Sequence, residues 1–231
     1  AFLSQQVSEI LDNTADLAPP ARALLEAQKV QFVLFDLGGV LADVDVKLAE
    51  NEWVSSGYRS EDFERAFYES GAKPLGDLGQ LDQEGMRACI AESVAREFSL
   101  DTLHRVWGAV VCWRPWVESL LGRMRLPYGV LSTIDPIHAA ALGPLPGAQP
   151  IVYSCDIGAV KPDPRAFESA AAACPVPPER IRYVDDLAEN VRAAREVGFR
   201  AYQVSGRAAL ERALADVLVD ELSEACLRDD L

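Results

Sequence analysis

The apolar positions of the chain fall into short runs, and stretches with helical periodicity separate them. The first run, Val30 to Phe35, is apolar apart from Gln31, which is typical of a strand in a parallel sheet covered on both faces. Beyond Arg114, strand-like and helix-like segments alternate. The elements predicted there are helix 115–124, strand 128–132, strand 150–154, helix 164–173, strand 180–186, helix 187–197 and strand 201–205.

Between Asp43 and Trp113 the pattern changes, and no comparable strand is predicted. Helical patterns fill this stretch, among them EDFERAFYE and LDTLHRVWGAVV, and the turn-rich segment KPLGDLGQ divides it. A helical insertion within an α/β domain is the simplest explanation. The alternation resumes at Pro115, a residue type that is common at the first position of a helix.

The succession of strand and helix predicts right-handed crossovers and a doubly wound, Rossmann-like parallel sheet of the α/β class, with an inserted α-helical cap. Helices are expected before and after this core in the sequence, and they offer surfaces for packing on the core or for contacts with other proteins. The expected organisation is a helical arm over 1–29, a core formed by 30–42 and 114–206, the cap over 43–113, and a C-terminal helix over 207–231.

The composition of the chain argues against some classes of binding partner. The chain has 231 residues, of which 49% are hydrophobic and 25% charged, and its formal net charge is -14. No cluster of Lys and Arg could neutralise a phosphate backbone, which argues against nucleic acid and anionic membranes. No apolar run approaches the roughly 20 residues that cross a bilayer. The five cysteines form no CxxC pair, which favours reduced thiols, so we expect a soluble, cytoplasmic protein.

Polar residues follow the predicted strands at the point where each strand ends. Asp36 follows the first, Ser132 and Thr133 follow the second, and Asp185 and Asp186 follow the run RIRYV, while Lys161 comes after a strand and a short loop. Because ligands bind at the carboxyl ends of parallel strands, these side chains are expected to converge. Carboxylates that lie together beside a lysine suit Mg²⁺ and a phosphate group.

The segments FDLGGVL, VLST, GAVKPDPRAF and YVDDLAENVRAAREVGF, in this order, resemble the motifs of the haloacid dehalogenase (HAD) superfamily of hydrolases with a C1-type helical cap. The resemblance covers about residues 31–205, and its two longer motifs are specific. It implies that Asp36 is a nucleophile that forms an aspartyl-phosphate. It also implies that Ser132 hydrogen-bonds the phosphoryl oxygens, and that Lys161 holds both the nucleophile and the phosphate.

The same resemblance implies a magnesium site. Asp186, with help from Asp185, is expected to bind Mg²⁺ together with the carboxylate of Asp36 and the main-chain carbonyl of Gly38. Asn190 begins a row with a spacing of four residues, which places it on one face of the following helix and near the site. It is expected to orient the metal-binding carboxylates.

Gly38 departs from the usual pattern, because most phosphatases of this superfamily carry there an Asp that acts as general acid and base. Such help is typically worth 10² to 10⁴-fold, so its absence predicts a slow enzyme, a good leaving group such as a sugar 1-phosphate, or a substitute acid. Asp43 and Asp45 are the candidates for a substitute, although both also suit turn or helix-cap roles. The motif resembles an FDxGxV subgroup, some of whose members hydrolyse sugar phosphates.

The preferred hypothesis is therefore a Mg²⁺-dependent hydrolase of a small phosphorylated metabolite. One alternative is 2-haloacid dehalogenation, in which the aspartate attacks carbon without a metal; the paired acids of the DD motif argue against it. Another is a protein with impaired catalysis and a binding or regulatory role, which Gly38 supports and the retained site residues oppose. His104 and His138 have no partner at ligand spacing, and His138 at most reaches a substrate.

Overall fold

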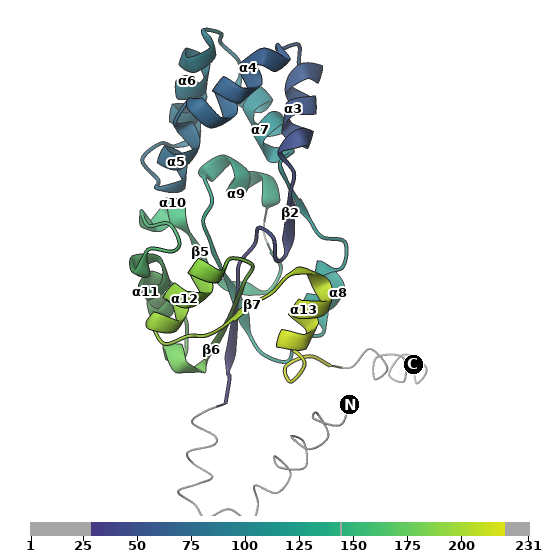
Figure 1. Ribbon diagram of the computed structural model, residues 1–231, viewed down its shortest axis with the longest axis vertical. Helices are drawn as coiled ribbons and strands as arrows, with labels where there is room; N and C mark the ends of the chain where they lie inside the picture. The colour runs from purple at the N-terminus through teal and green to yellow at the C-terminus, as the bar shows by residue number, and fades with distance from the viewer. Residues whose placement is uncertain (1–28, 144, 220–231) are drawn as a thin grey trace, which may run out of the picture.

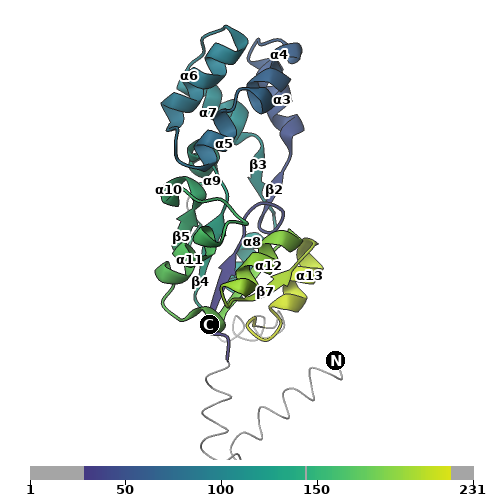
Figure 2. The same ribbon diagram turned by 60° about the vertical axis from the view of Figure 1, so that its left-hand side comes forward.

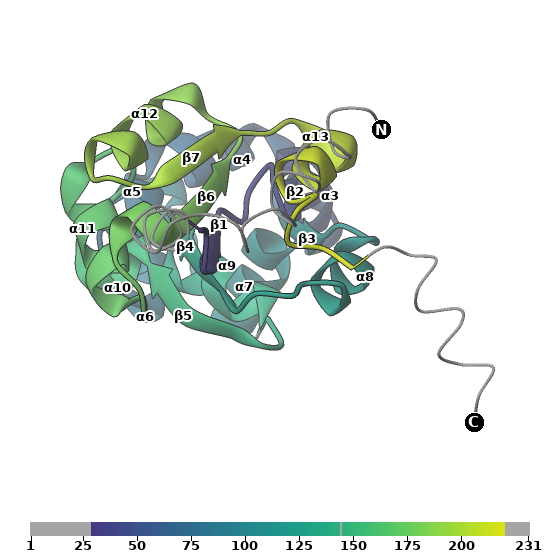
Figure 3. The ribbon, with the colours of Figure 1, turned by 90° about the horizontal axis from the view of Figure 1, so that it is seen from below.

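The computed structural model describes residues 29–143 and 145–219, and its centre is a five-stranded sheet in which every neighbouring pair is parallel. The strand order is β5-β4-β1-β6-β7 (Figure 3). This confirms the predicted α/β class and the doubly wound parallel sheet. The strands are β1 (Phe32–Phe35), β4 (Tyr128–Ser132), β5 (Ala148–Tyr153), β6 (Ile181–Asp185) and β7 (Arg200–Gln203).

The two central strands, β1 and β6, are buried along their whole length. In the register, Phe35 lies opposite Val184, and the Asp36 amide donates to the Val184 carbonyl at 3.0 Å. The residue after β1 therefore stands beside the last residue of β6. This register brings Asp36 next to Asp185.

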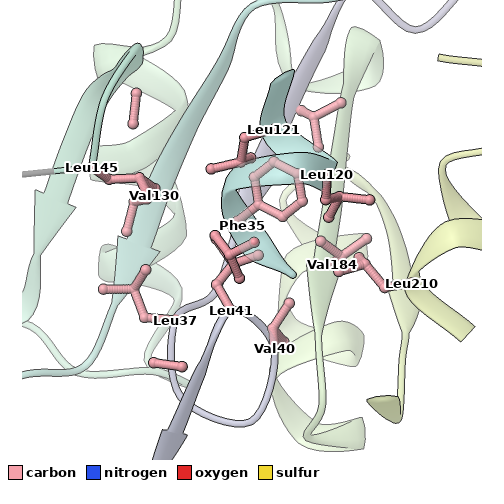
Figure 4. Packing of buried hydrophobic residues seen from close by; sticks show 14 of the residues in the cluster. Phe35, Leu37, Val40, Leu41, Leu120, Leu121, Val130, Leu145, Val184 and Leu210 are labelled. Atoms are coloured by element: carbon pink, nitrogen blue, oxygen red, sulfur yellow. The ribbon is translucent and has the colours of Figure 1, made fainter. Parts of the chain in front are cut away.

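Helices cover both faces of the sheet (Figure 3). Val33 and Phe35 face α8 (Val117–Gly122) and α13 (Gly206–Ala213) in one buried apolar cluster, part of which is drawn in Figure 4. The alternate strand residues join the cluster beneath α11 (Pro164–Ala173) and α12 (Ala188–Glu196) on the other face. Burial on both faces explains why β1 has no alternation of apolar and polar residues.

Three short helices were not predicted from the sequence. They are α9 (Pro136–Leu142), α10 (Ser154–Ile157) and the 3-10 helix η3 (Pro178–Arg180). No helix is predicted between the strands expected over 128–132 and 150–154, but α9 lies there. It starts as a helix because the Asp135 carboxylate accepts hydrogen bonds from the amides of Ile137 and His138 and because a proline occupies its first position.

Between the first and second strands of the sheet, the chain forms a helical layer above the strand ends (Figures 1 and 2). This layer has its own buried cluster, centred on Trp53, Met86, Ile90, Leu103 and Trp107. Its helices are α3 (Val46–Ser55), α4 (Ser60–Glu64), the π-helix η2 (Arg65–Glu69), α5 (Ala72–Asp77), α6 (Gln83–Val94) and α7 (Leu100–Gly108). We refer to these helices as the cap.

The cap is joined to the core by a small antiparallel ribbon of β2 (Ala42–Val44) and β3 (Val111–Trp113). The stretch 43–113 was expected to contain helices alone, and the two strands differ from that expectation. Each has three residues, too few to give a recognisable alternation. Because the ribbon begins directly after the β1 loop, it holds the cap over the site.

The cap also packs on the core through α9. Ile137 of this core helix is fully buried within the cap's apolar cluster. In a second contact, α5 approaches so closely that a Cβ atom on Gly76 would lie 3.0 Å from the Cβ of Asp135 and 2.6 Å from the sulfur of Met86. Only glycine allows this approach, so α5 and the start of α9 form one packed unit.

The predicted arm over 1–29 falls almost entirely outside the described residues, as does the end of the predicted C-terminal helix. Within the described residues that helix stops at Ala213 instead of continuing, and Leu218 forms a β-bridge with Met124. The turn buries Leu214, Val217 and Leu218 against the core, which explains why the helix ends. Over the described ranges, no helix is both long and apolar enough to cross a membrane.

Candidate active site

Four loops at the carboxyl edge of the sheet bring the predicted site residues together. Asp36 follows β1, Ser132 ends β4, and Asp185 ends β6 with Asp186 directly after it. One carboxylate oxygen from each of the three aspartates lies within 4.8 Å of the others. Lys161 reaches the same point from the loop between α10 and α11. The convergence expected from the strand ends is therefore present.

Lys161 stands between two of these carboxylates. Its Nζ lies 2.6 Å from Oδ1 of Asp36 and 2.8 Å from Oδ2 of Asp185, and only 4% of its side chain is exposed. A buried ammonium that contacts two carboxylates neutralises most of their mutual repulsion. This contact fixes the position of Asp36, whose Oδ1 also accepts a hydrogen bond from the Leu37 amide at 2.7 Å.

Asp185 is held from several directions. Its carboxylate accepts hydrogen bonds from the Leu187 amide at 2.8 Å and from the Asn190 side-chain amide at 3.0 Å to each oxygen. The hydroxyl of Tyr183 donates to it as well. Asn190 thus contacts an acid of the site, as its place in the helix suggested. Tyr183 was missed, although its position two residues before Asp185 puts both side chains on the same face of β6.

Burial and charge shift the protonation of these groups. Burial, reinforced by the charge of Asp185, raises the pKa of Asp36 to about 6, even though Lys161 acts in the opposite direction. For Asp185, burial would raise the pKa, but Lys161 and the hydrogen bonds to the carboxylate lower it. Burial and the charge of Asp185 raise the pKa of Asp186. The site therefore holds more negative charge than Lys161 alone compensates.

Asp186 is the acid most available to a metal ion, because no side chain of the described residues donates a hydrogen bond to its carboxylate. Gly39 makes room for it. Gly39 has φ +73°, and a Cβ there would lie 2.1 Å from Oδ2 of Asp186. Oxygen donors from three clustered carboxylates fit the preference of Mg²⁺. Asp36 and Asp186 could coordinate such an ion, while Asp185 is occupied by its own donors.

The loop after β4 completes the other side of the site. Ser132 is buried and lines a large cleft at the sheet edge. Thr133 accepts a hydrogen bond from the Lys161 amide through Oγ1 at 3.0 Å. Ser154 accepts from the Ile134 amide at 2.9 Å and so anchors the next residue of the loop. Neither contact was predicted, because both join loops that are distant in sequence.

The cleft has a volume of about 880 Å³ and lies between the sheet edge and the β2–α3 segment. Gly38, Asp43 and Asp45 all line it. Each of the two acids has a structural partner. Asp43 forms an ion pair with Arg114, Nε to Oδ1 at 2.7 Å, and Asp45 caps α3 by accepting from the Lys47 amide at 2.9 Å. Arg114 is a cationic residue of the cleft that the motifs did not reveal.

Three matches, one to a protein sequence and two to crystal structures, extend along most of the chain. D-ribitol-5-phosphate phosphatase of Bacteroides thetaiotaomicron is 24% identical over 205 residues, which cover 82% of this chain and 98% of the relative. The crystal structure of a HAD family enzyme from Bacteroides thetaiotaomicron, in complex with magnesium and inorganic phosphate, matches with a TM-score of 0.68 at 21% identity, over 77% of this chain and 96% of that one.

The third is L-2-haloacid dehalogenase from Xanthobacter autotrophicus, with a TM-score of 0.55 at 18% identity, over 84% of this chain and 86% of that one. At this level of identity, the two structural matches show a shared fold. The family model for haloacid dehalogenase-like hydrolases matches residues 30–198, which include β1, the cap and the strand ends that carry the site. The chain belongs to the haloacid dehalogenase-like hydrolases.

Proposed function

We propose that this chain is a Mg²⁺-dependent phosphomonoester hydrolase in which Asp36 is the nucleophile. The observation that carries the proposal is the position of Lys161, which lies buried between Asp36 and Asp185 with Asp186 beside them. This arrangement holds one carboxylate at the mouth of a cleft and surrounds it with groups that stabilise a phosphoryl anion.

In the proposed reaction, an oxygen of Asp36 attacks phosphorus and the bond from phosphorus to the leaving-group oxygen breaks. The product is an aspartyl-phosphate, and the released oxygen takes a proton from solvent, because Gly38 has no acid to supply one. Water then attacks phosphorus and loses a proton to solvent, and the bond between phosphorus and the Asp36 oxygen breaks. Inorganic phosphate is released and the Asp36 carboxylate is restored. Two successive displacements replace one difficult step.

The chain's own residues hold the phosphoryl group through both steps. Lys161 supplies positive charge, and Ser132 supplies a hydroxyl at the other side of the site. Asp36 and Asp186, with a main-chain carbonyl of Gly38, would hold Mg²⁺, which when bound supplies further positive charge against the phosphoryl oxygens. Asn190 and Tyr183 keep Asp185 in place and so keep Lys161 directed at Asp36.

The proposed substrate is a small phosphorylated metabolite, with sugar and polyol phosphates as the leading class. Support comes from the similarity to D-ribitol-5-phosphate phosphatase, which extends over nearly the whole length of that relative. The missing acid at Gly38 is consistent with slow turnover or with a leaving group that departs without strong acid help. Asp43 and Asp45 are tied to Arg114 and to α3, so we propose that neither replaces it in the resting site.

Two rival functions remain distinguishable. The fold is shared with an L-2-haloacid dehalogenase, but three clustered carboxylates are better suited to a metal and a phosphate than to attack on a carbon–halogen bond. A binding or regulatory protein would keep Mg²⁺ affinity without turnover.

The test is hydrolysis of para-nitrophenyl phosphate with Mg²⁺ and with excess chelator, by the wild type and by Asp36→Asn. We expect Mg²⁺-dependent turnover that falls on the order of 10³-fold or more in Asp36→Asn, because the nucleophile is lost. The matched control is Asp62→Asn, which removes a cap carboxylate paired with Arg65 outside the cleft. Calorimetry with Mg²⁺ distinguishes an enzyme from a binding or regulatory protein. Mg²⁺ binding without any turnover would contradict the phosphatase proposal and favour a binding or regulatory role.

A further inference from the structure

A second cavity, of about 200 Å³, adjoins the catalytic cleft on the cap side. The two spaces share Gly38, Val44, Ser132 and Thr133 in their walls, so they meet where the missing acid would stand. By volume, the cavity corresponds to about six or seven waters of liquid. A group attached to a phosphate in the cleft can therefore extend into it.

Apart from Ser132 and Thr133, which it shares with the cleft, the cavity is lined by one polar side chain from the cap and one from the core. Lys73 comes from α5, and His138 comes from α9. Behind them, Nζ of Lys73 lies 2.8 Å from Asp77 and 3.4 Å from the fully buried Asp135, whose carboxylate also contacts Nδ1 of His138. Cap and core residues that are distant in sequence thus form one polar cluster.

His138 has one unused ring nitrogen. The residue is buried, and its Nε2 is shielded from solvent and has no hydrogen-bond partner among the described residues. Leaving a buried polar atom unpaired costs free energy, and such atoms are rare in folded proteins. A hydroxyl both donates and accepts, so it can serve this nitrogen in either tautomer. His104, by contrast, already contacts Gln83 at 2.9 Å.

Charge limits what this end of the cavity can bind. The Lys73 ammonium is shared by two carboxylates, Asp77 and Asp135. Burial would raise the pKa of Asp135, but the contacts with His138 and the charge of Lys73 lower it to about 2, so this acid stays ionised near neutral pH. With one ammonium and two carboxylates, the cluster of Lys73, Asp77 and Asp135 has no net positive charge. A second anionic group on a substrate would find no uncompensated cation there.

The remaining walls of the cavity restrict the shape of the group that can bind there. They are mostly aliphatic and include Leu37, Val110, Val111, Ile134 and Leu142. None of the described residues that line the cavity is Phe, Tyr or Trp, so a nucleobase would lack a stacking partner. A short chain of carbons with hydroxyl groups matches both the apolar walls and the polar end.

We propose that this cavity is the subsite for the leaving group, and that it selects uncharged, hydroxylated leaving groups through His138 and Lys73. The inference rests on the proposed phosphatase function and adds the residues that recognise the organic part of the ester. A leaving-group hydroxyl pairs with Nε2 of His138. Because the two carboxylates of the cluster outnumber its one ammonium, it disfavours a carboxylate or a second phosphate.

The first test compares His138→Asn with His138→Gln. Asn keeps a polar atom near the Nδ1 position but none at Nε2, whereas Gln can place its amide near Nε2. In His138→Asn we expect kcat/KM for ribitol 5-phosphate to fall at least tenfold more than kcat/KM for para-nitrophenyl phosphate, which has no hydroxyl. We expect His138→Gln to recover part of this difference. His104→Asn is the matched control, with an unchanged ratio.

The second test changes the charge of the cluster while its shape is kept. Glycerol 3-phosphate and 3-phosphoglycerate have the same skeleton, but one ends in a hydroxymethyl group and the other in a carboxylate. The wild type should prefer glycerol 3-phosphate. Asp77→Asn removes one negative charge beside Lys73 and should lower this preference about tenfold or more.

The outcomes separate the subsite from the function. If wild type hydrolyses para-nitrophenyl phosphate and His138→Asn changes both esters equally, His138 is a packing residue and the subsite is overturned. An unaltered preference in Asp77→Asn, with normal thermal stability, would overturn the selection by charge. If the wild type hydrolyses none of these esters in the presence of Mg²⁺, the proposed phosphatase function is wrong, and the proposed subsite is wrong with it.

Discussion

The catalytic cleft and the smaller cavity beside it meet at Gly38 but are built in opposite ways. In the cleft, Asp36, Ser132 and Asp186 come from the ends of neighbouring strands of one sheet. In the cavity, the polar residues Lys73 and His138 come from the cap and the core and meet only because the two bodies dock. Two neighbouring sites thus have different origins. The strand order of the sheet brings the cleft residues together, whereas the packing of the cap on the core brings the cavity residues together.

This difference separates chemistry from selectivity. Groups at the strand ends are fixed by the register of a rigid sheet, which suits a reaction that depends on positioning. Groups between cap and core depend on one contact surface, which can vary without moving the nucleophile. Substitutions in the cleft should therefore abolish turnover, whereas substitutions in the cavity should change which ester is preferred.

The largest expected effect is on the cleft. Lys161→Met removes the ammonium that contacts Asp36 at 2.6 Å and Asp185 at 2.8 Å. Two buried carboxylates then lack their partner, so we expect the free energy of unfolding to fall by about 3 to 5 kcal/mol and turnover to be lost. Urea unfolding and para-nitrophenyl phosphate hydrolysis measure the two effects.

The double variant Lys161→Met with Asp185→Asn identifies the cause. It removes one of the two uncompensated charges and should regain part of the stability without regaining turnover. Arg165→Met, which breaks the exposed ion pair with Asp163, serves as the control and should leave the urea midpoint nearly unchanged. Equal losses in the buried and exposed variants would show that Lys161 does not stabilise the fold by neutralising Asp36 and Asp185.

A smaller effect is expected from the cavity cluster, through Asp135. Its pKa is lowered from 3.8 to about 2 in the folded protein, so it stabilises the fold above the unfolded value and loses that contribution as pH falls towards 2. The whole shift is worth about 2 kcal/mol, of which about 1 kcal/mol is lost by pH 3. The stability difference between wild type and Asp135→Asn should therefore shrink by about 1 kcal/mol from pH 5 to pH 3.

Urea unfolding at the two pH values measures this change, and any constant cost of the Asn side chain cancels between them. A difference that stays the same at both pH values would show that Asp135 is not held ionised by Lys73 and His138. Selection by charge in the cavity would then lose its basis, because it needs two carboxylates around one ammonium.

The contrast between the two regions explains how much the sequence could predict. The sheet and the convergence at its edge followed from apolar runs and from the rule for parallel strands, so Asp36, Ser132 and Asp185 were placed together correctly. The ribbon of β2 and β3 was missed because each strand has only three residues. The helix α9 was missed because a proline at its start made the segment resemble a loop.

What could not be predicted depends on contacts between distant parts of the chain. Thr133 accepts from the amide of Lys161, and Asp135 joins Lys73 across 62 residues. Neither pair has a local pattern, because the approach of α5 to α9 depends on how two separate apolar clusters fit together. His138 was expected at most to reach a substrate, and its burial and its contact with Asp135 were not predicted.

The last prediction concerns the point where cleft and cavity meet, and it changes activity rather than stability. Gly38 has no left-handed φ, and a Cβ there would meet only Val44 Cγ2, at 3.4 Å, so a Cβ atom can be added without backbone strain. If the site lacks only a general acid, Gly38→Asp should raise kcat/KM for glycerol 3-phosphate about tenfold and leave para-nitrophenyl phosphate, whose leaving group departs readily, almost unaffected. The Asn side chain in Gly38→Asn has the same shape as Asp but no acidic proton, so this variant should show no gain in kcat/KM.

Equal losses in Gly38→Asp and Gly38→Asn would have a different meaning. Any side chain at position 38 would then obstruct the passage from the cleft to the cavity, and the glycine would be retained for space rather than lost from a catalytic pair. In that case the loss should increase with the size of the leaving group, from glycerol 3-phosphate to ribitol 5-phosphate. Comparing the activity of the variants on the two substrates thus decides between two explanations of Gly38. Either the position lacks a general acid, or the glycine keeps the passage between cleft and cavity open.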